Sequence, residues 1–93
     1  MSDLDLVDEE SLLAAARAGD EVAFGRLLKL HHKGLERFCY LMLGDADDGK
    51  CALEETVLGA WRERELAEPT TTPRMWLYRH AMIACLGDRG LHR

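Results

Sequence analysis

The 93-residue sequence lacks the signals of a β-sheet, a membrane span and a disulfide framework. It contains no alternating run of β-branched residues, and its apolar runs are far too short to cross a bilayer. The cysteines, Cys39, Cys51 and Cys85, are odd in number and widely spaced, so they suit reduced, buried thiols better than disulfides or a zinc site. The acidic start MSDLDLVDEE does not resemble a secretory signal. We therefore expect a cytoplasmic protein that does not enter a membrane.

Catalytic and cofactor motifs are also missing. There is no Gly-rich phosphate loop, no H-E-x-x-H and no nucleophile elbow. His31 and His32 are adjacent, so on a helix they point about 100° apart and cannot hold one metal ion together. Glu54 and Glu55 diverge in the same way, which argues against a paired acid and base. We expect no metal, no cofactor and no enzymatic activity, and we interpret both histidines as structural.

The balance of charge is negative, with a formal net charge of −5. This charge argues against a freestanding, generic nucleic-acid binder, because phosphate attraction requires clustered cations. It leaves open a local basic patch, or DNA binding within a larger assembly. The length corresponds to one domain.

What the sequence does contain is helical periodicity, punctuated by caps and breakers. Asp8, Asp20 and Thr72 are suitable N-caps, and Pro73 suits a first helical position. The prolines of the segment 68–73 exclude a continuous helix there. The sequence thus predicts an all-α protein, a compact bundle of four helices. Their expected spans are Glu9 to Ala18, Asp20 to about Gly44, Asp47 or Asp48 to about Arg64, and Pro73 to Gly87 or Gly90.

Each predicted helix has one apolar face at spacings of three and four residues. In chain order, these faces comprise Leu12, Leu13 and Ala16; Phe24, Leu27, Leu28, His31, Leu35, Phe38 and Met42; Leu53, Val57, Ala60 and Trp61; and Trp76, Leu77, His80, Ala81 and Ala84. The periodicity favours core packing over base stacking for both tryptophans. Tyr78 lies off the main stripe, and either role is open to it.

Four segments occur in an order and at a spacing that resemble a known family. They read SLLAAARAGDEVAFGRLLKLHH, FCYLMLGD, LEETVLGAW and PRMWLYRHA. From Glu10 to about Leu86, the chain resembles region 2 of the extracytoplasmic-function (ECF) sigma factors of bacterial RNA polymerase. The resemblance implies one region 2-like domain over residues 1–93, with its core at about 8–88 and a flexible segment at 1–7.

The resemblance also implies partners and sites. In the family, the second and third helices bind the β′ clamp helices of core RNA polymerase, while the following loop and the fourth helix bind the separated minus-ten strand of promoter DNA. An anti-sigma factor is a further candidate partner. The implied polymerase-binding residues are Asp45, Asp48, Glu54, Glu55 and Leu58. The implied DNA-binding residues are Arg62, Arg64, Arg74, Tyr78, Arg79 and His80.

Several positions depart from the family pattern where contacts are expected. Met82 and Ile83 occupy places where the family tends to have Arg or Thr followed by Asn, and neither can make equivalent hydrogen bonds to DNA. Glutamates in the loop repel phosphate; they are Glu63, Glu65 and Glu68. An alternative hypothesis is therefore a sigma-like protein-interaction module, which binds polymerase or a regulator without reading DNA. An exposed Met82 and Ile83 would then form an apolar patch for a protein partner.

Overall fold

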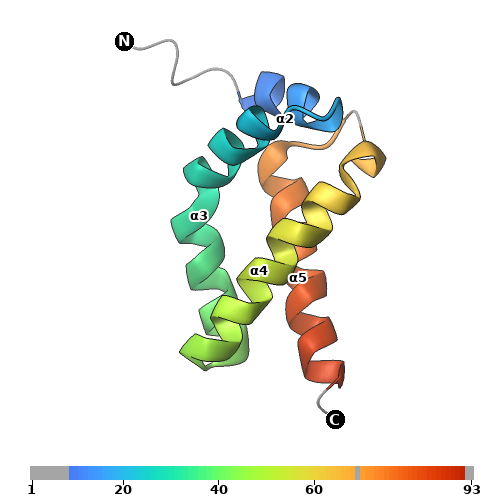
Figure 1. Cartoon of the computed structure of the whole chain (residues 1–93). Coiled ribbons are helices and arrows are strands. Elements are labelled where there is room, and N and C mark those ends of the chain that lie inside the picture. The colour runs from blue at the N-terminus through green and yellow to red at the C-terminus, as the bar shows by residue number, and fades with distance from the viewer. Residues whose placement is uncertain (1–8, 69, 92–93) are drawn as a thin grey trace.

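The computed structural model describes residues 9–68 and 70–91, which form a bundle of helices (Figure 1). No strand occurs in these residues, so the predicted all-α class is confirmed. The elements are α2 (Glu9–Arg17), α3 (Glu21–Leu43), α4 (Ala46–Arg62), the short 3-10 helix η1 (Arg64–Leu66) and α5 (Pro73–Leu91). The three long helices pack against one another, and α2 lies across the end of the bundle where α3 begins. The predicted cap Asp8 and the segment 1–7 lie outside the described residues.

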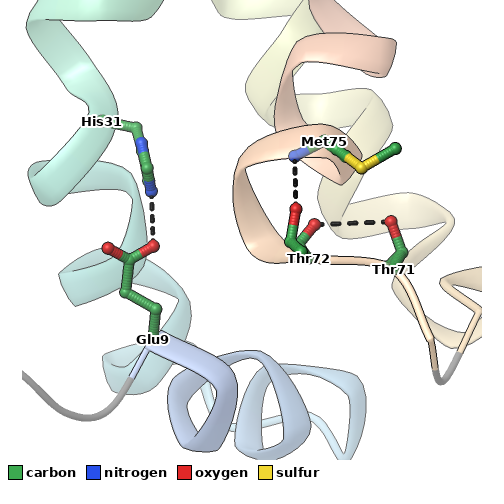
Figure 2. Close-up of polar contacts among 5 residues, drawn as sticks. All are labelled: Glu9, His31, Thr71, Thr72 and Met75. Atoms are coloured by element: carbon green, nitrogen blue, oxygen red, sulfur yellow. Dashed lines mark hydrogen bonds and ion pairs between the residues drawn. The ribbon is translucent and has the colours of Figure 1, made fainter.

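The helix boundaries follow the caps that the sequence predicts. The Asp20 carboxylate accepts hydrogen bonds from the backbone N–H groups of Val22 and Ala23, at 3.0 and 3.1 Å, and so starts α3. Gly44 ends α3 in the left-handed region, with φ 71°, a conformation that favours glycine. At α5, the Thr72 hydroxyl accepts from the Met75 N–H at 3.1 Å (Figure 2).

The apolar face of α3 supplies much of the core, as predicted. Phe24, Leu27 and Leu35 are buried, and Leu28, Phe38 and Met42 pack against them while partly exposed. Phe24 also contacts both tryptophans, with ring centroids 5.1 Å from Trp61 and 6.2 Å from Trp76. Trp76 is buried and Trp61 is half-buried, so the core interpretation of the tryptophans is confirmed most fully for Trp76.

The buried face of α4 differs in part from the prediction, which is confirmed for Ala60. Small residues, rather than Leu53 and Val57, are fully buried: Gly49, Ala52, Thr56 and Ala60. A β-carbon built at Gly49 would lie 3.2 Å from the Cα of Tyr40, which shows how closely the backbones of α3 and α4 approach. Close helix packing therefore selects the small side chains, and the larger ones lie half-buried at the edge of the interface.

Three further details correct the sequence-based expectations. The helix α4 begins at Ala46 and ends at Arg62, and η1 takes up the next residues. The helix α5 continues past both Gly87 and Gly90 to Leu91, since an isolated glycine costs a helix only about 1 kcal/mol. Cys51 is exposed, so the expectation of a buried thiol holds only for Cys39 and Cys85. Burial raises the pKa of the Cys39 thiol.

His31 has the structural role that the sequence suggests. Its Nε2 lies 2.8 Å from a carboxylate oxygen of Glu9, and this contact joins the start of α2 to the middle of α3 (Figure 2). The described residues contain no group of three or more side chains that could hold a metal ion. Within the same ranges, no helix is both long enough and apolar enough to span a membrane.

Candidate functional site

A groove between α3 and α4 forms the first candidate surface. Its volume is about 500 Å³. The floor is apolar, and charged or polar groups stand at its rim. The lining residues are Leu28, His32, Leu35, Lys50, Leu53, Glu54, Val57 and Leu58. Because the small residues of α4 fill the tight interface with α3, Leu53 and Val57 are left to line this groove.

The residues implied in polymerase binding are all exposed, but they do not all share the groove. Glu54 and Leu58 line it. Asp45 caps α4 by accepting a hydrogen bond from the Asp47 N–H at 3.0 Å, and Asp48 lies in the same first turn. Glu55 lines a separate hollow between α4 and α5. The implied polymerase-binding residues thus extend along α4, and two of them, Glu54 and Leu58, line the groove.

The loop after α4 forms the second candidate surface, together with α5. Here Arg64 is held locally, because its Nη1 donates to the Trp61 carbonyl at 2.8 Å and its guanidinium lies 4.0 Å from the centre of the Trp61 ring. Ala67 is buried and anchors the loop against the bundle. The loop therefore lies beside α5, and residues of both line one pocket.

A polar pocket lies between this loop and α5. Arg79 and His80 project from α5, and Glu63, Glu68 and Thr71 come from the loop. Its remaining lining residues are Leu66, Ala67, Trp76 and Ile83. Trp76 is only 4% exposed, and its indole N–H has no hydrogen-bond partner among the described residues. The indole nitrogen is itself buried, so it is an unsatisfied donor in the core beside the pocket, and such a group is costly.

His80 lies between that pocket and the neighbouring hollow, which Arg62 also lines. Its ring meets the edge of the Trp76 ring at a centroid distance of 5.8 Å. Burial lowers the pKa of His80; Glu63 opposes this effect, whereas Arg79 and Arg62 add to it. At neutral pH the imidazole is therefore uncharged, with one nitrogen that can donate and one that can accept.

Arg74 and Tyr78 lie apart from the pocket, on the side of α5 that faces α3. The Tyr78 ring packs edge-on against Phe38, at 5.4 Å between centroids, and the Arg74 guanidinium lies 5.1 Å from the centre of the Tyr78 ring. A β-carbon at Gly34 would overlap the Tyr78 hydroxyl. The arginine and tyrosine therefore form a stacked pair at the seam between the two helices.

The residues implied in DNA binding thus divide into groups. Arg62, Arg79 and His80 gather where α4, the loop and α5 meet, and Arg74 and Tyr78 form a second cluster. Sequence reasoning missed Trp76 as a pocket residue, since its periodicity assigns it to the core. Its spacing of three and four residues from Arg79 and His80 was the available signal, because such positions share a helix face.

Comparison with known proteins identifies the class of this domain. The chain is similar to sigma factors of RNA polymerase over most of its length. It is 35% identical over 78 residues to the ECF RNA polymerase sigma factor SigM of Mycobacterium tuberculosis strain H37Rv, a match that covers 84% of this chain and 40% of that protein. For the protein of the same name from strain Erdman, the identity is 36% over 75 residues, covering 81% of this chain and 38% of the relative.

No family model matches the chain, and no solved structure does. The two matches nevertheless show that the chain contains a domain of the ECF sigma-factor type. The chain spans about 40% of the length of these relatives.

Proposed function

We propose that this chain is a sigma-factor region 2 domain. It docks on core RNA polymerase and takes part in recognising and melting the minus-ten promoter element, and it catalyses no reaction of its own. The proposal rests on the similarity to ECF sigma factors and, above all, on the polar pocket beside α5, which brings Arg79 and His80 together with the carboxylates of Glu63 and Glu68.

That pocket suits a base that has left its stack. A flipped-out base presents both donors and acceptors on its edge and an apolar face. The pocket wall offers Arg79 as a donor, the carboxylates of Glu63 and Glu68 as acceptors, and Ile83 as apolar surface. The carboxylates of the loop therefore have a local use, although they repel phosphate at longer range.

The groove between α3 and α4 is the proposed site for the β′ clamp helices. The groove has an apolar floor with Glu54 in its lining, and further acidic residues lie in the first turn of α4. This arrangement suits an amphipathic helical partner with basic residues, since such charge pairing also speeds association. Leu58 is 54% exposed at the edge of this groove and is the side chain best placed to enter a partner surface.

The proposal is tested by two binding measurements at a stated salt concentration. One uses the β′ clamp helices, and the other uses single-stranded minus-ten oligonucleotides. We expect Leu58→Glu to abolish clamp binding and to leave DNA binding unchanged, and Arg79→Ala to do the reverse. Leu41→Glu is the matched control for the first variant, because Leu41 is 66% exposed and lines neither surface. If the unmodified chain binds neither the clamp helices nor the oligonucleotide, the proposal is refuted.

A second candidate function is the interaction module that binds polymerase or a regulator without reading DNA. The observation in its favour is an apolar patch on α5, where Met82, Ile83 and Leu86 are 47%, 57% and 55% exposed. An anti-sigma factor is one partner that such a patch could bind. Clamp binding without any DNA binding would support this candidate over the first.

A further inference from the structure

Four cations form a stripe along the solvent face of α3. They are Arg26, Lys29, Lys33 and Arg37, called here the α3 basic stripe. Spacings of three and four residues place them on one face of the helix, and all four are exposed. With a rise of 1.5 Å per residue, the stripe is about 16 Å long. None of the four forms an ion pair or hydrogen bond with the described residues.

This absence of partners is informative in a chain with a net charge of −5. Acidic residues are abundant, yet Glu36 is the one carboxylate of α3 at the flank of the stripe, and Glu21 lies at the start of the helix. The Glu9 carboxylate contacts His31, which belongs to the opposite, inward side of α3. Clustered cations without internal partners form an attractive surface for an anion.

The stripe adjoins the Arg74–Tyr78 pair of α5. Tyr78 packs against Phe38 and closes over Gly34. Arg37 and Lys33 immediately precede those two residues in α3, so each lies about 100° around the helix from the seam. Lys33 and Arg37 are thus the members of the stripe that are adjacent in sequence to the residues that Tyr78 contacts.

We propose that the α3 basic stripe binds the phosphate backbone of nucleic acid, as a second contact beside the α5 surface. This inference rests on the proposed function, because it assumes that promoter DNA reaches Arg74 and Tyr78. A row of cations alongside a stacked aromatic group is the arrangement that tracks a backbone without selecting its sequence. The stripe thus contributes affinity and salt dependence, while the pocket contributes base selection.

The test measures the affinity of the 93-residue chain for a single-stranded oligothymidylate as a function of salt. Each phosphate contact contributes about 0.7 to the slope of log K against log salt on single strands. We expect Lys33→Gln to lower this slope by about 0.7 and the double variant K33Q/R37Q to lower it by about 1.4. Lys33→Arg retains the charge and should retain the slope.

Each outcome separates this inference from the proposed function. A lower slope for K33Q/R37Q, with an unchanged thermal midpoint of unfolding and with the slope retained in Lys33→Arg, supports the stripe. An unchanged slope in K33Q/R37Q, with weaker binding in Arg74→Ala and Arg79→Ala, overturns the inference and leaves the α5 site standing. A lower slope in K33Q/R37Q, with unchanged binding in Arg74→Ala and Arg79→Ala, supports the stripe and rejects the α5 site. A loss of polymerase binding instead of DNA binding shows that the stripe is a protein surface, and no DNA binding by the unmodified chain overturns both.

Discussion

Gly34 is the position where a small change tests the packing of α3 on α5 most directly. It is exposed and lies in the middle of α3, where alanine normally stabilises a helix by about 1 kcal/mol relative to glycine. Here, however, a β-carbon would overlap the Tyr78 hydroxyl. Gly25 lies on the same helix, is also exposed, and has nothing within 4 Å of its β-carbon position, so it is a matched control.

The expected magnitudes follow from these contacts. Gly25→Ala should stabilise the protein by about 1 kcal/mol. Gly34→Ala should gain the same stabilisation from helix propensity, but overpacking should lower the free energy of unfolding by about 1–3 kcal/mol. The added methyl group also disturbs the edge-on contact of Tyr78 with Phe38. The net effect of Gly34→Ala is therefore about 0–2 kcal/mol of destabilisation. Removing the hydroxyl with Tyr78→Phe should restore the gain of about 1 kcal/mol.

The assay is urea unfolding, together with thermal unfolding, of the single variants and of the double variant G34A/Y78F. A change of 1 kcal/mol shifts the thermal midpoint of a domain of this size by about 4–8 °C, which is easily measured. The coupling free energy between the two positions should be about 1–3 kcal/mol. If Gly34→Ala stabilises the unmodified chain as much as Gly25→Ala does, the Tyr78 hydroxyl does not occupy the space above Gly34, and the packing argument fails.

Three further predictions test other features of the structure. The lowered pKa of His80 means that the unfolded state binds a proton that the folded state does not, so the free energy of unfolding should rise with pH from the lowered pKa up to about 6.5. His80→Gln should flatten this rise in unfolding curves measured across that window, and an unchanged pH dependence would contradict the assignment. Thr72→Ala removes the N-cap of α5 and should destabilise the protein by about 1 kcal/mol, whereas Thr70→Ala, at an exposed turn, should have little effect on the urea midpoint. A thiol reagent should label Cys51 rapidly in the folded protein and the other two cysteines only in denaturant; equal labelling rates would disprove their burial.

The two ends of α3 and the start of α5 could be predicted from the sequence because their causes are local. Asp20 and Thr72 bond to N–H groups two or three residues ahead, and Gly44 adopts a conformation that favours glycine. Such contacts depend on residue type and spacing alone. The apolar face of α3 was predictable for the same reason, since one helical period determines which side chains point inward.

Features that depend on the distance between helices were not predictable in this way. Hydrophobicity favoured Leu53 and Val57 for the buried face of α4, but the close approach of α3 admits only small side chains at Gly49 and its neighbours on that face. The same shift leaves Leu53 and Val57 to line the candidate docking groove. Likewise, Gly34 lowers the helix propensity of α3. The sequence does not show why glycine is needed there, because the hydroxyl that occupies the space belongs to Tyr78 on α5.

The net charge of the chain predicts weak DNA binding, whereas the chemistry of the pocket beside α5 favours base recognition. The two expectations are compatible if the chain binds DNA while attached to polymerase. A net charge of −5 weakens long-range attraction between the free chain and DNA. The pocket beside α5 nevertheless combines donors and acceptors at one place, and Glu63 and Glu68 are part of its wall. Docking through the α3–α4 groove would hold that pocket next to promoter DNA and make the second binding event effectively intramolecular. On this proposal, attachment to polymerase strengthens base recognition, and a weak but measurable affinity of the isolated chain for DNA is the expected consequence of its charge.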